Sequence, residues 1–377
     1  MRTIQFQMCG RLIFGSGALA ELPGAMEKLG AQKALIVTDP GLVKAGVCAL
    51  IQQTLDEAKI SHALFDGVEP DPRIEIVQAC ADAVRESGAD VLIGLGGGSS
   101  LDIAKMASVV MTNDGDVLDF VGIGNIPKPG MKKILIPTTS GTGSEVTPIA
   151  VLSDKAAHLK KGVVSDYLYP DVALVDPDLT IGLPPAVTAF TGMDAMTHAV
   201  EAYTNKNAHP FIDTFALEAV RLIGQYLPRA VADGKDIEAR SNMSQASLYG
   251  GMCLGPVNTA AVHALAYPLG GTFDVAHGVA NSLLLPHVMR FNAPSCPEKY
   301  ARIAEALGRE ATADEAVAGI EALSKKAGIV SQMRELNIPR DAIGEMAKAA
   351  MQVARLLNNN PRELTEEDAK QIYEAAW

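Results

Sequence analysis

The sequence predicts an N-terminal α/β domain with a parallel sheet, residues 1–183, and an all-α C-terminal domain, residues 184–377. Two observations lead to this prediction. In the first half, short apolar runs alternate with amphipathic helical patterns, which is typical of parallel strands joined by helices. In the second half the strand signals stop, and Ala-, Leu- and Met-rich helical patterns continue to the C-terminus. A chain of 377 residues is long enough for two such domains.

The N-terminal elements are predicted in chain order. The predicted strands lie in "KALIVTD" (33–39), "HALFDGV" (62–68), "DVLIGLGGGSS" (90–100), "KKILIPTTSGTGSE" (132–145) and "PDVALVDPDL" (170–179). An amphipathic helix is predicted at 73–88. Two of the strands run directly into segments rich in glycine and hydroxyl groups, which marks them as candidate ligand loops.

Charge and cysteine usage limit the expected partners and compartment. The formal net charge is −12 and there is no basic run, so neither nucleic acid nor an anionic membrane is an expected partner. No apolar run approaches the ~18 residues of a membrane span. The five cysteines are odd in number, scattered and free of any CxxC pair. This usage favours a reducing compartment, and we expect a cytoplasmic protein.

The first candidate loop, "GLGGGSSLDIAK", follows a strand and opens a helix. Gly96, Gly97 and Gly98 let the backbone approach a ligand closely, and a helix N-terminus favours an anion. Ser99 is predicted as the N-cap, with Asp102 completing a capping box. The segment departs from GxGxxG because Ser99 stands where the third glycine belongs. A tight strand–helix turn without a ligand is the alternative interpretation.

The second candidate loop, "TTSGTGSE" (138–145), offers the hydroxyls of Thr138, Thr139 and Thr142 to phosphate, ribose or a carboxamide. A solvated loop is the alternative. Because the carboxyl ends of strands line one crevice in an open α/β sheet, a dinucleotide can touch both loops. The first domain is therefore a candidate dinucleotide-binding domain.

Asp39 ends the first clear strand. An acid there can accept from the two hydroxyls of an adenosine ribose and repel a 2′-phosphate. In an ordinary Rossmann domain this acid follows the glycine loop, whereas Asp39 precedes it. On local grounds, a turn aspartate before Pro40-Gly41 is the favoured interpretation.

Asp194 and His198 lie four residues apart in the helical pattern "TAFTGMDAMTHAVEAYT", for which Thr191 or Gly192 is the predicted N-cap. Residues at this spacing share a helix face, roughly 5–6 Å apart at Cβ. An oxygen and a nitrogen ligand in that position can bind one divalent ion. A surface pair in which the carboxylate orients the imidazole is the alternative.

Three of the seven histidines lie within 263–287. His263 is in an apolar helical context that Pro268 and Gly270-Gly271 are expected to end, and His277 begins the next pattern. A buried core histidine is the ordinary interpretation of each. Together, Asp194, His198, His263 and His277 supply one oxygen and three nitrogens, which suits Fe(II) or Zn(II) better than Mg²⁺ or Ca²⁺.

At this point the chain resembles the iron-containing (group III) alcohol dehydrogenase family. "GGGSSLDIAK" and "PTTSGTGSEVT" are similar to its two cofactor loops, and "GMDAMTHAVEAY" and "HALAYPLGGTFDVAHGVAN" to its two metal-ligand signatures. The resemblance covers essentially the whole chain in the family's motif order. It implies reversible hydride transfer between NAD(H) and a small alcohol or aldehyde, with a metal polarising the substrate oxygen, and an assembly of at least two subunits.

The resemblance also implies residue roles. Asp194, His198, His263 and His277 would bind the metal, and His263, His277 and Tyr267 would surround the reaction. The cofactor contacts implied or considered are Asp39, Gly96, Gly97, Gly98, Ser99, Asp102, Thr138, Thr139, Thr142 and Lys160. Asp71 stands where the family frequently has an Asn, so the adenine-side contact of that Asn does not carry over.

Tyr267 stands where family members often carry a second histidine four residues after the first. On a helix it shares a face with His263, so we expect it to border the metal and shape the substrate pocket. A phenol with an ordinary pKa near 10 is a poorer base at neutral pH than an imidazole. A core tyrosine packed beside Pro268 is the alternative.

Two related activities remain as alternatives. A maleylacetate reductase-type enzyme would reduce a carboxylated substrate, but residues 246–289 contain no Arg or Lys to receive a carboxylate. A dehydroquinate synthase-type lyase would need several cations near the metal for its phosphorylated substrate. A non-enzymatic metal-binding protein would not require two cofactor loops.

Overall fold

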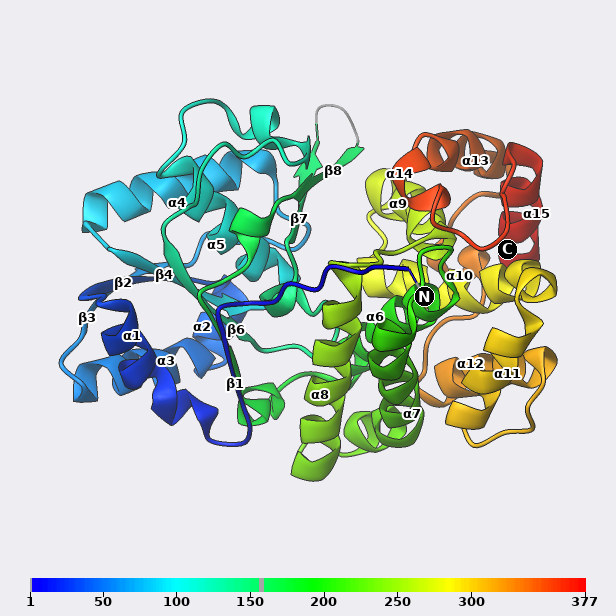
Figure 1. Ribbon diagram of the computed structural model, residues 1–377, viewed down its shortest axis with the longest axis horizontal. Helices are drawn as coiled ribbons and strands as arrows, with labels where there is room; N and C mark the ends of the chain where they lie inside the picture. The colour runs from blue at the N-terminus through cyan, green and yellow to red at the C-terminus, as the bar shows by residue number, and fades with distance from the viewer. Residues whose placement is uncertain (1, 156–158) are drawn as a thin grey trace. The chain divides into compact units, whose positions relative to one another are not determined.

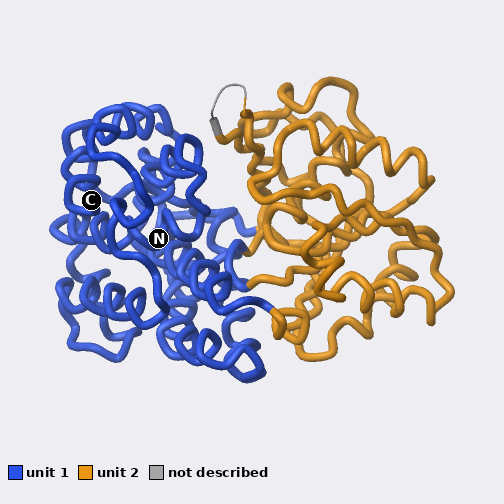
Figure 2. The backbone as a smooth tube through the Cα atoms, turned by 180° about the vertical axis from the view of Figure 1, so that it is seen from behind, with its two compact units in different colours: residues 1–6, 140–142, 183–377 blue, residues 7–139, 143–182 orange. Residues whose placement is uncertain are grey.

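The computed structural model describes residues 2–155 and 159–377. The chain forms two compact units (Figure 2). The α/β unit comprises residues 7–139 and 143–182, and the helical unit comprises residues 1–6, 140–142 and 183–377. The short segment 140–142, within the second candidate loop, therefore belongs to the helical unit.

The main sheet of the α/β unit is parallel at every strand pair. Its order is β1 (Arg11–Phe14), β9 (Val172–Val175), β6 (Lys132–Pro137), β4 (Val91–Gly96), β2 (Lys33–Val37) and β3 (Ser61–Phe65). The predicted α/β class with a parallel sheet is confirmed. Each predicted strand is present and shorter than predicted, and β3 begins one residue before its predicted range. The edge strand β1 was not predicted, because its apolar run, residues 12–14, is only three residues long.

Helices cover both faces of this sheet (Figure 1). The helices of this unit are α1 (Leu22–Leu29), α2 (Pro40–Lys44), α3 (Val47–Glu57), α4 (Ile74–Ser87) and α5 (Gly98–Val110). Leu35 and Leu92 pack on the side of α4 and α5, whereas Ile36 and Ile93 pack on the side of α1 and α3. Because both faces are buried, the central strands are continuously apolar rather than alternating.

Short elements complete the α/β unit. A small second sheet has the order β5 (Gly122–Ile123), β8 (Leu159–Val164) and β7 (Ile149–Asp154). The 3₁₀ turns are η1 (Ala18–Glu21), η2 (Val117–Phe120), η3 (Ser144–Val146), η4 (Asp166–Leu168) and η5 (Pro177–Thr180).

The strand order explains why Asp39 precedes the glycine loop in the sequence. β2 and β4 are neighbours, with Val37 paired to Gly94, and the chain leaves them toward opposite edges of the sheet. This is the topological switch point of a doubly wound sheet, where ligands bind at the carboxyl ends of the strands. Asp39 follows β2 and Gly97 follows β4, so the two predicted contacts flank that point.

The predicted capping box at the start of α5 is wrong. Gly97 is the N-cap, and Ser99 lies inside the first turn. Gly96 has φ +148, a conformation that glycine adopts readily, so the helix begins directly after the strand. The Asp102 carboxylate is used elsewhere: it accepts from Ser144 Oγ at 2.6 Å and from the backbone N–H of Val151 at 2.9 Å.

Lys105, in the same motif, is a fully buried cation that anchors η3 and β7 to α5. Its Nζ donates to Ser144 Oγ at 2.7 Å, to Thr147 Oγ1 at 3.2 Å and to the Ile149 carbonyl at 2.8 Å. Burial lowers the pKa of Lys105 to about 8, although the Asp102 charge opposes that shift. Burial also raises the pKa of Glu145, in the second loop, to about 7.

The helical unit consists of helices and short 3₁₀ turns. Its helices are α6 (Pro185–Thr204), α7 (Pro210–Ala232), α8 (Ile237–Leu254), α9 (Ala261–Phe273), α10 (His277–Asn292), α11 (Pro297–Ala306), α12 (Ala313–Lys326), α13 (Ile343–Met351), α14 (Ala354–Leu357) and α15 (Glu366–Ala376). Its 3₁₀ turns are η6 (Ala293–Ser295), η7 (Met333–Leu336) and η8 (Arg340–Ala342).

Two predicted helix boundaries in this unit are wrong. The first is the start of α6, which begins at Pro185, so Thr191 and Gly192 are interior positions rather than N-caps. Proline fits the first turn, where its missing N–H has no intrahelical partner. The second is that α9 continues through Pro268. The surrounding apolar core, in which Leu265 and Leu269 are fully buried, outweighs the lost hydrogen bond. None of the helices in the described residues is both long enough and apolar enough to cross a membrane.

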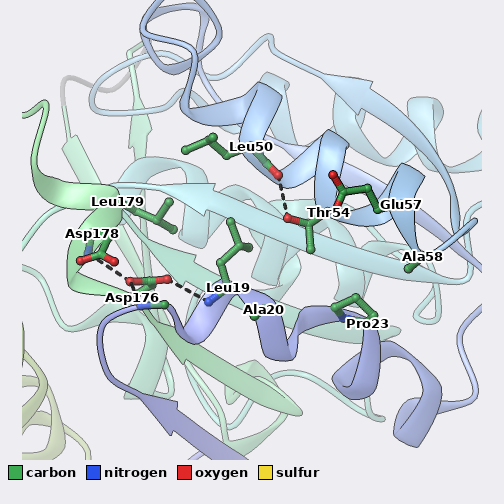
Figure 3. Close-up of a pocket in the computed structure, with 11 residues that line it drawn as sticks. Leu19, Ala20, Pro23, Leu50, Thr54, Glu57, Ala58, Asp176, Asp178 and Leu179 are labelled. Atoms are coloured by element: carbon green, nitrogen blue, oxygen red, sulfur yellow. Dashed lines mark hydrogen bonds between the residues drawn. The ribbon is translucent and has the colours of Figure 1, made fainter.

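A surface pocket of about 630 Å³ lies in the α/β unit, between η1, α3 and η5 (Figure 3). Its polar groups are engaged within the fold. Asp176 accepts from the backbone N–H groups of Gly17 and Leu19, and Thr54 donates to the Leu50 carbonyl. Among the described lining residues, none is a sequence-predicted site residue, so we assign this pocket no function.

The buried Glu145 carboxyl predicts an unusual dependence of stability on pH. Its pKa is about 7 in the folded protein and 4.5 ordinarily, so between these values the folded state binds the extra proton. Stability from this group therefore falls as pH rises from 4.5 to 7. Glu145→Gln should gain stability relative to wild type over that window, by at most about 3 kcal/mol.

Urea denaturation at pH 5 and pH 8 measures the difference. The control is Glu86→Gln, at an exposed position of α4, which should show no such trend. A Glu145→Gln difference that is independent of pH would contradict the assignment of a raised pKa.

Candidate metal centre

α6 places two of the predicted ligands in the interior. Asp194 is 3% exposed and His198 is 5% exposed, so the surface-pair interpretation is wrong. His198 Nε2 lies 4.0 Å from Asp194 Oδ2. The face continues one turn further to Glu201, which is also buried. Three ionisable side chains therefore line one face of a helix that also contributes many apolar side chains to the core.

α9 and α10 bring His263 and His277 to the same place, and both helices contact α6. Asp194, His263 and His277 each offer one ligand atom within 4.8 Å of the others. The His198 ring stacks on the His263 ring, with centroids 4.9 Å apart. All four candidate ligands are thus together: three form a tight group and His198 lies directly beside it.

The protonation states suit metal binding. Burial raises the pKa of Asp194, but the neighbouring histidines and the Asn281 amide more than offset it, so this pKa lies below its ordinary value. Burial, reinforced by His198 and His277, lowers the pKa of His263 well below its ordinary value. An ionised carboxylate and a neutral imidazole are the forms that bind a cation.

Two residues beside the candidate ligands each hold a buried polar atom without a partner. His198 Nδ1 and Asn281 Oδ1 are shielded from solvent and have no hydrogen-bond partner among the described residues. Buried polar atoms without partners are costly, so each one calls for an explanation, such as an ion that the site would hold. With one carboxylate and three imidazoles, the donor set matches Fe(II) or Zn(II).

Glu201 is a residue of this centre that the sequence analysis missed. Its carboxylate accepts from the backbone N–H groups of Ala260 at 3.0 Å and Val262 at 2.6 Å, and lies 2.6 Å from His263 Nδ1. Burial raises the pKa of Glu201 to about 7 in spite of these donors. The sequence held a signal for it, because positions 194, 198 and 201 continue one helix face.

The contact with Glu201 sets the His263 tautomer. The proton lies on Nδ1, facing the carboxylate, because Nε2 lies 3.1 Å from the Asn281 amide nitrogen, which only donates. The Nε2 lone pair is therefore directed at the other ligand atoms. A carboxylate that orients a histidine in this way is a common partner of metal ligands.

Tyr267 lies where the helical spacing predicts, on the face of α9 that carries His263. Its ring centroid is 6.5 Å from that of His277. Burial raises the pKa of Tyr267, and the charge of Arg355 only partly opposes the shift. The phenol therefore stays protonated at neutral pH and does not act as a base.

Arg355, on α14, is a second residue that the sequence analysis missed. α14 packs beside α9 (Figure 1), and the Arg355 charge acts on both His263 and Tyr267. Its Nη1 is shielded from solvent and has no hydrogen-bond partner among the described residues. Residues 246–289 contain no Arg or Lys, and from that segment alone we expected no cation to receive a carboxylate near this centre. Arg355 is such a cation, and it comes from much later in the chain.

The candidate cofactor residues of the α/β unit differ in the contacts that they make. Gly97 and Thr139 lie side by side: a Cβ on Gly97 would be 3.5 Å from the Thr139 side chain. Asp39 caps α2 by accepting from the Leu42 N–H at 3.1 Å, as the turn interpretation expected. Lys160 forms an ion pair with Asp71 at 2.5 Å and donates to Ser153 Oγ.

The hydroxyl-rich loop also has a packing role within the helical unit. A Cβ on Gly141 would lie 2.7 Å from Thr191 Cβ, so only glycine fits against α6 there. Ser140 Oγ lies 3.1 Å from Ser244 Oγ on α8. Thr142 lies in this same segment. Close backbone packing therefore accounts for the first glycine of "SGTG".

Glu201→Gln is expected to weaken the binding of a divalent cation by ~10–100-fold. The glutamine amide would donate to His263 Nδ1, which moves the histidine proton to Nε2 and blocks the lone pair. Chelator-competition titration measures the dissociation constant. Glu218→Gln, at an exposed carboxylate on α7, is the matched control, and equal affinity in the two variants would refute the positioning role.

Both parts of the chain match known proteins. Residues 9–177 match the "Iron-containing alcohol dehydrogenase" family model, and residues 188–377 match "Fe-containing alcohol dehydrogenase family, C-terminal". A long-chain-alcohol dehydrogenase of Geobacillus thermodenitrificans is 43% identical, over 96% of this chain and 94% of the relative. A sulfoacetaldehyde reductase of Bilophila wadsworthia is 38% identical, over 97% of each.

A solved structure agrees in fold over the whole chain. The crystal structure of a 1,3-propanediol oxidoreductase has a TM-score of 0.97 and 39% identity, with 100% of each chain covered. The matches to both family models cover nearly all of this chain. The protein therefore belongs to the iron-containing alcohol dehydrogenase family.

Proposed function

We propose that this protein is an NAD(H)-dependent alcohol dehydrogenase that interconverts a small alcohol and its aldehyde at a divalent metal, Fe(II) first and Zn(II) second. The observation that carries the proposal is the group formed by the buried Asp194 and His263 and the partly exposed His277, whose ligand atoms lie within 4.8 Å of one another. It is supported by membership of a family of metal- and NAD(H)-dependent oxidoreductases.

The helical unit holds the ion. Asp194, His198, His263 and His277 are the proposed ligands, and Glu201 keeps His263 in the binding tautomer. When bound, the ion supplies Lewis-acid polarisation of the substrate oxygen. Tyr267 keeps its proton and contributes a wall of the substrate site, with at most a donated hydrogen bond.

The α/β unit is proposed to bind the dinucleotide. The backbone at 96–98 and Ser99 would receive the pyrophosphate at the start of α5, and Thr138, Thr139 and Lys160 are the proposed polar contacts of this unit. Thr142, which belongs to the helical unit, is proposed as a further contact. Asp102 acts indirectly, because its carboxylate is bound to Ser144 and Val151. Asp39, at the switch point, favours NAD over NADP because a 2′-phosphate would be repelled by its charge.

We also propose a cytoplasmic homodimer on the strength of the family resemblance. Light scattering of the purified protein tests the assembly, and a monomer at micromolar concentration would refute it. The proposed functional division is a dinucleotide-binding part over 1–183 and a metal-binding part over 184–377.

Arg355 favours a second, narrower function, the reduction of aldehydes that carry a carboxylate or sulfonate. A buried guanidinium nitrogen without an acceptor is costly, and an anionic substrate group would supply one. The sulfoacetaldehyde reductase among the relatives has a name that fits such a substrate. This substrate class resembles that of the maleylacetate reductase-type alternative, but it arises at an intact Asp194/His198 site.

If the reaction depends on the metal, the substitution His263→Ala should cause a loss of both metal and activity. Removing one imidazole and leaving Glu201 without its histidine partner should lower both metal content and turnover by more than ~100-fold. NADH absorbance with an aldehyde substrate and elemental analysis of the purified variant measure the two quantities. Normal turnover with full metal occupancy would contradict the proposal, and His62→Ala, in the other unit, is the control.

Arg355→Ala tests the substrate class. We expect kcat/KM to fall ~10–100-fold for a carboxylated or sulfonated aldehyde, the scale of one charge-assisted contact, and to change little for a neutral aldehyde of equal length. Arg334→Ala, at an exposed arginine of the same unit, is the control. An equal loss for charged and neutral substrates would reject the narrower function while leaving the general reaction intact.

A further inference from the structure

The Asp71 carboxylate is paired with Lys160, a lysine that we propose as a cofactor contact. Asp71 lies in the loop between β3 and α4, and Lys160 lies on β8. Asp71 Oδ1 is 2.5 Å from Lys160 Nζ, which also donates to Ser153 Oγ on β7 at 2.9 Å. The charge of this lysine is therefore balanced by the protein before any cofactor binds.

The backbone holds Asp71 in this position. Its φ is +51, in the left-handed region, which aspartate tolerates better than most side chains do. The next residue, Pro72, accepts from the Ser153 N–H at 2.8 Å, and Arg73 forms an isolated parallel bridge with Ser153. Ser153 in turn is directly opposite Lys160 in the pairing of β7 with β8. The fold itself thus brings the carboxylate to the ammonium group.

The ion pair lies beside the start of α5, where we propose that the pyrophosphate binds. Lys105 on α5 donates to the Ile149 carbonyl at the first residue of β7. One turn earlier on α5, Asp102 accepts from the N–H of Val151, two residues further along β7. β7 therefore runs along α5 toward the helix N-terminus. Ser153, a further two residues on, brings the pair to the first turn of that helix.

We infer that Asp71 lowers the affinity of the α/β unit for its dinucleotide by neutralising Lys160. The inference rests on the proposed function and adds to it a residue that sets how tightly the cofactor is held. A dinucleotide carries negative charge on its pyrophosphate, so a lysine without a carboxylate partner beside a helix N-terminus would attract it. The Lys160 side chain is only 12% exposed, so solvent and salt screen its charge less than at the surface.

The consequence is a cofactor that is released readily. With Asp71 present, the dinucleotide competes with a carboxylate that is already bound to the ammonium group. Weaker binding shortens the time that the oxidised or reduced cofactor stays on the enzyme, and ligand release limits turnover in many enzymes. Asp71 is therefore a residue that exchanges affinity for rapid cofactor turnover.

A neighbouring ion pair supplies a matched control. Lys161 is the next residue on β8, so its side chain points to the opposite face of the strand. Its Nζ lies 3.8 Å from Asp154 Oδ2. Asp154→Asn removes one negative charge from the same small sheet, as Asp71→Asn does, but on the face away from Lys160.

The test is a fluorescence titration of NADH into the full-length protein at low and at physiological salt. Asp71→Asn keeps the side-chain size, and Asp71→Gly removes the carboxylate without adding an amide; both residues tolerate the positive φ. Each variant should lower the NADH dissociation constant ~3–10-fold at low salt, and less at higher salt. Asp154→Asn should bind NADH as the wild type does.

A second pair of variants separates the charge of Lys160 from other effects. Asp71→Asn should leave NADH affinity unchanged when it is introduced into Lys160→Met, because the carboxylate then has no ammonium group to neutralise. A gain in affinity that persists without Lys160 would overturn the inference, as would wild-type or weaker affinity in either Asp71 variant. Failure of the wild type to bind NADH would instead overturn the proposed function of the α/β unit.

Discussion

The Glu201 carboxylate is the contact on which the helical unit's chemistry depends. It accepts from the first backbone N–H groups of the α9 region and from His263 Nδ1, so one buried acid joins α6 to α9 and selects a tautomer. A charge in the interior is costly unless donors surround it. Here the donors are the same groups that fix where the His263 lone pair points, so the fold and the site are stabilised by the same bonds.

The α/β unit uses its motif residues in a comparable way. Asp102 and Lys105 belong to a cofactor signature, yet both side chains form hydrogen bonds inside the protein, with Ser144 and with the backbone of β7. These bonds hold the second candidate loop against α5, the helix that follows the first candidate loop. The dinucleotide contacts are therefore left to backbone groups, small hydroxyls and the strand ends at the switch point between β2 and β4.

Periodicity and residue chemistry carried much of this account from the sequence. The spacing of Asp194 and His198 predicted a shared face, and the apolar runs predicted the central strands. Burial and long-range contacts could not be predicted from helical spacing and apolar runs. The N-cap of α5 depended on Gly96 entering a positive-φ conformation, and the continuation of α9 through Pro268 depended on the core around it. Arg355 was missed because it approaches His263 only through folding.

Anomalous diffraction at the iron edge, from crystals of the Fe(II)-loaded protein, tests the central claim most directly. We expect one strong peak bonded to Asp194, His198, His263 and His277, with Glu201 bound to the opposite nitrogen of His263. A peak that lies elsewhere, or an enzyme that turns over aldehyde with NADH while no ion occupies this position, would contradict it.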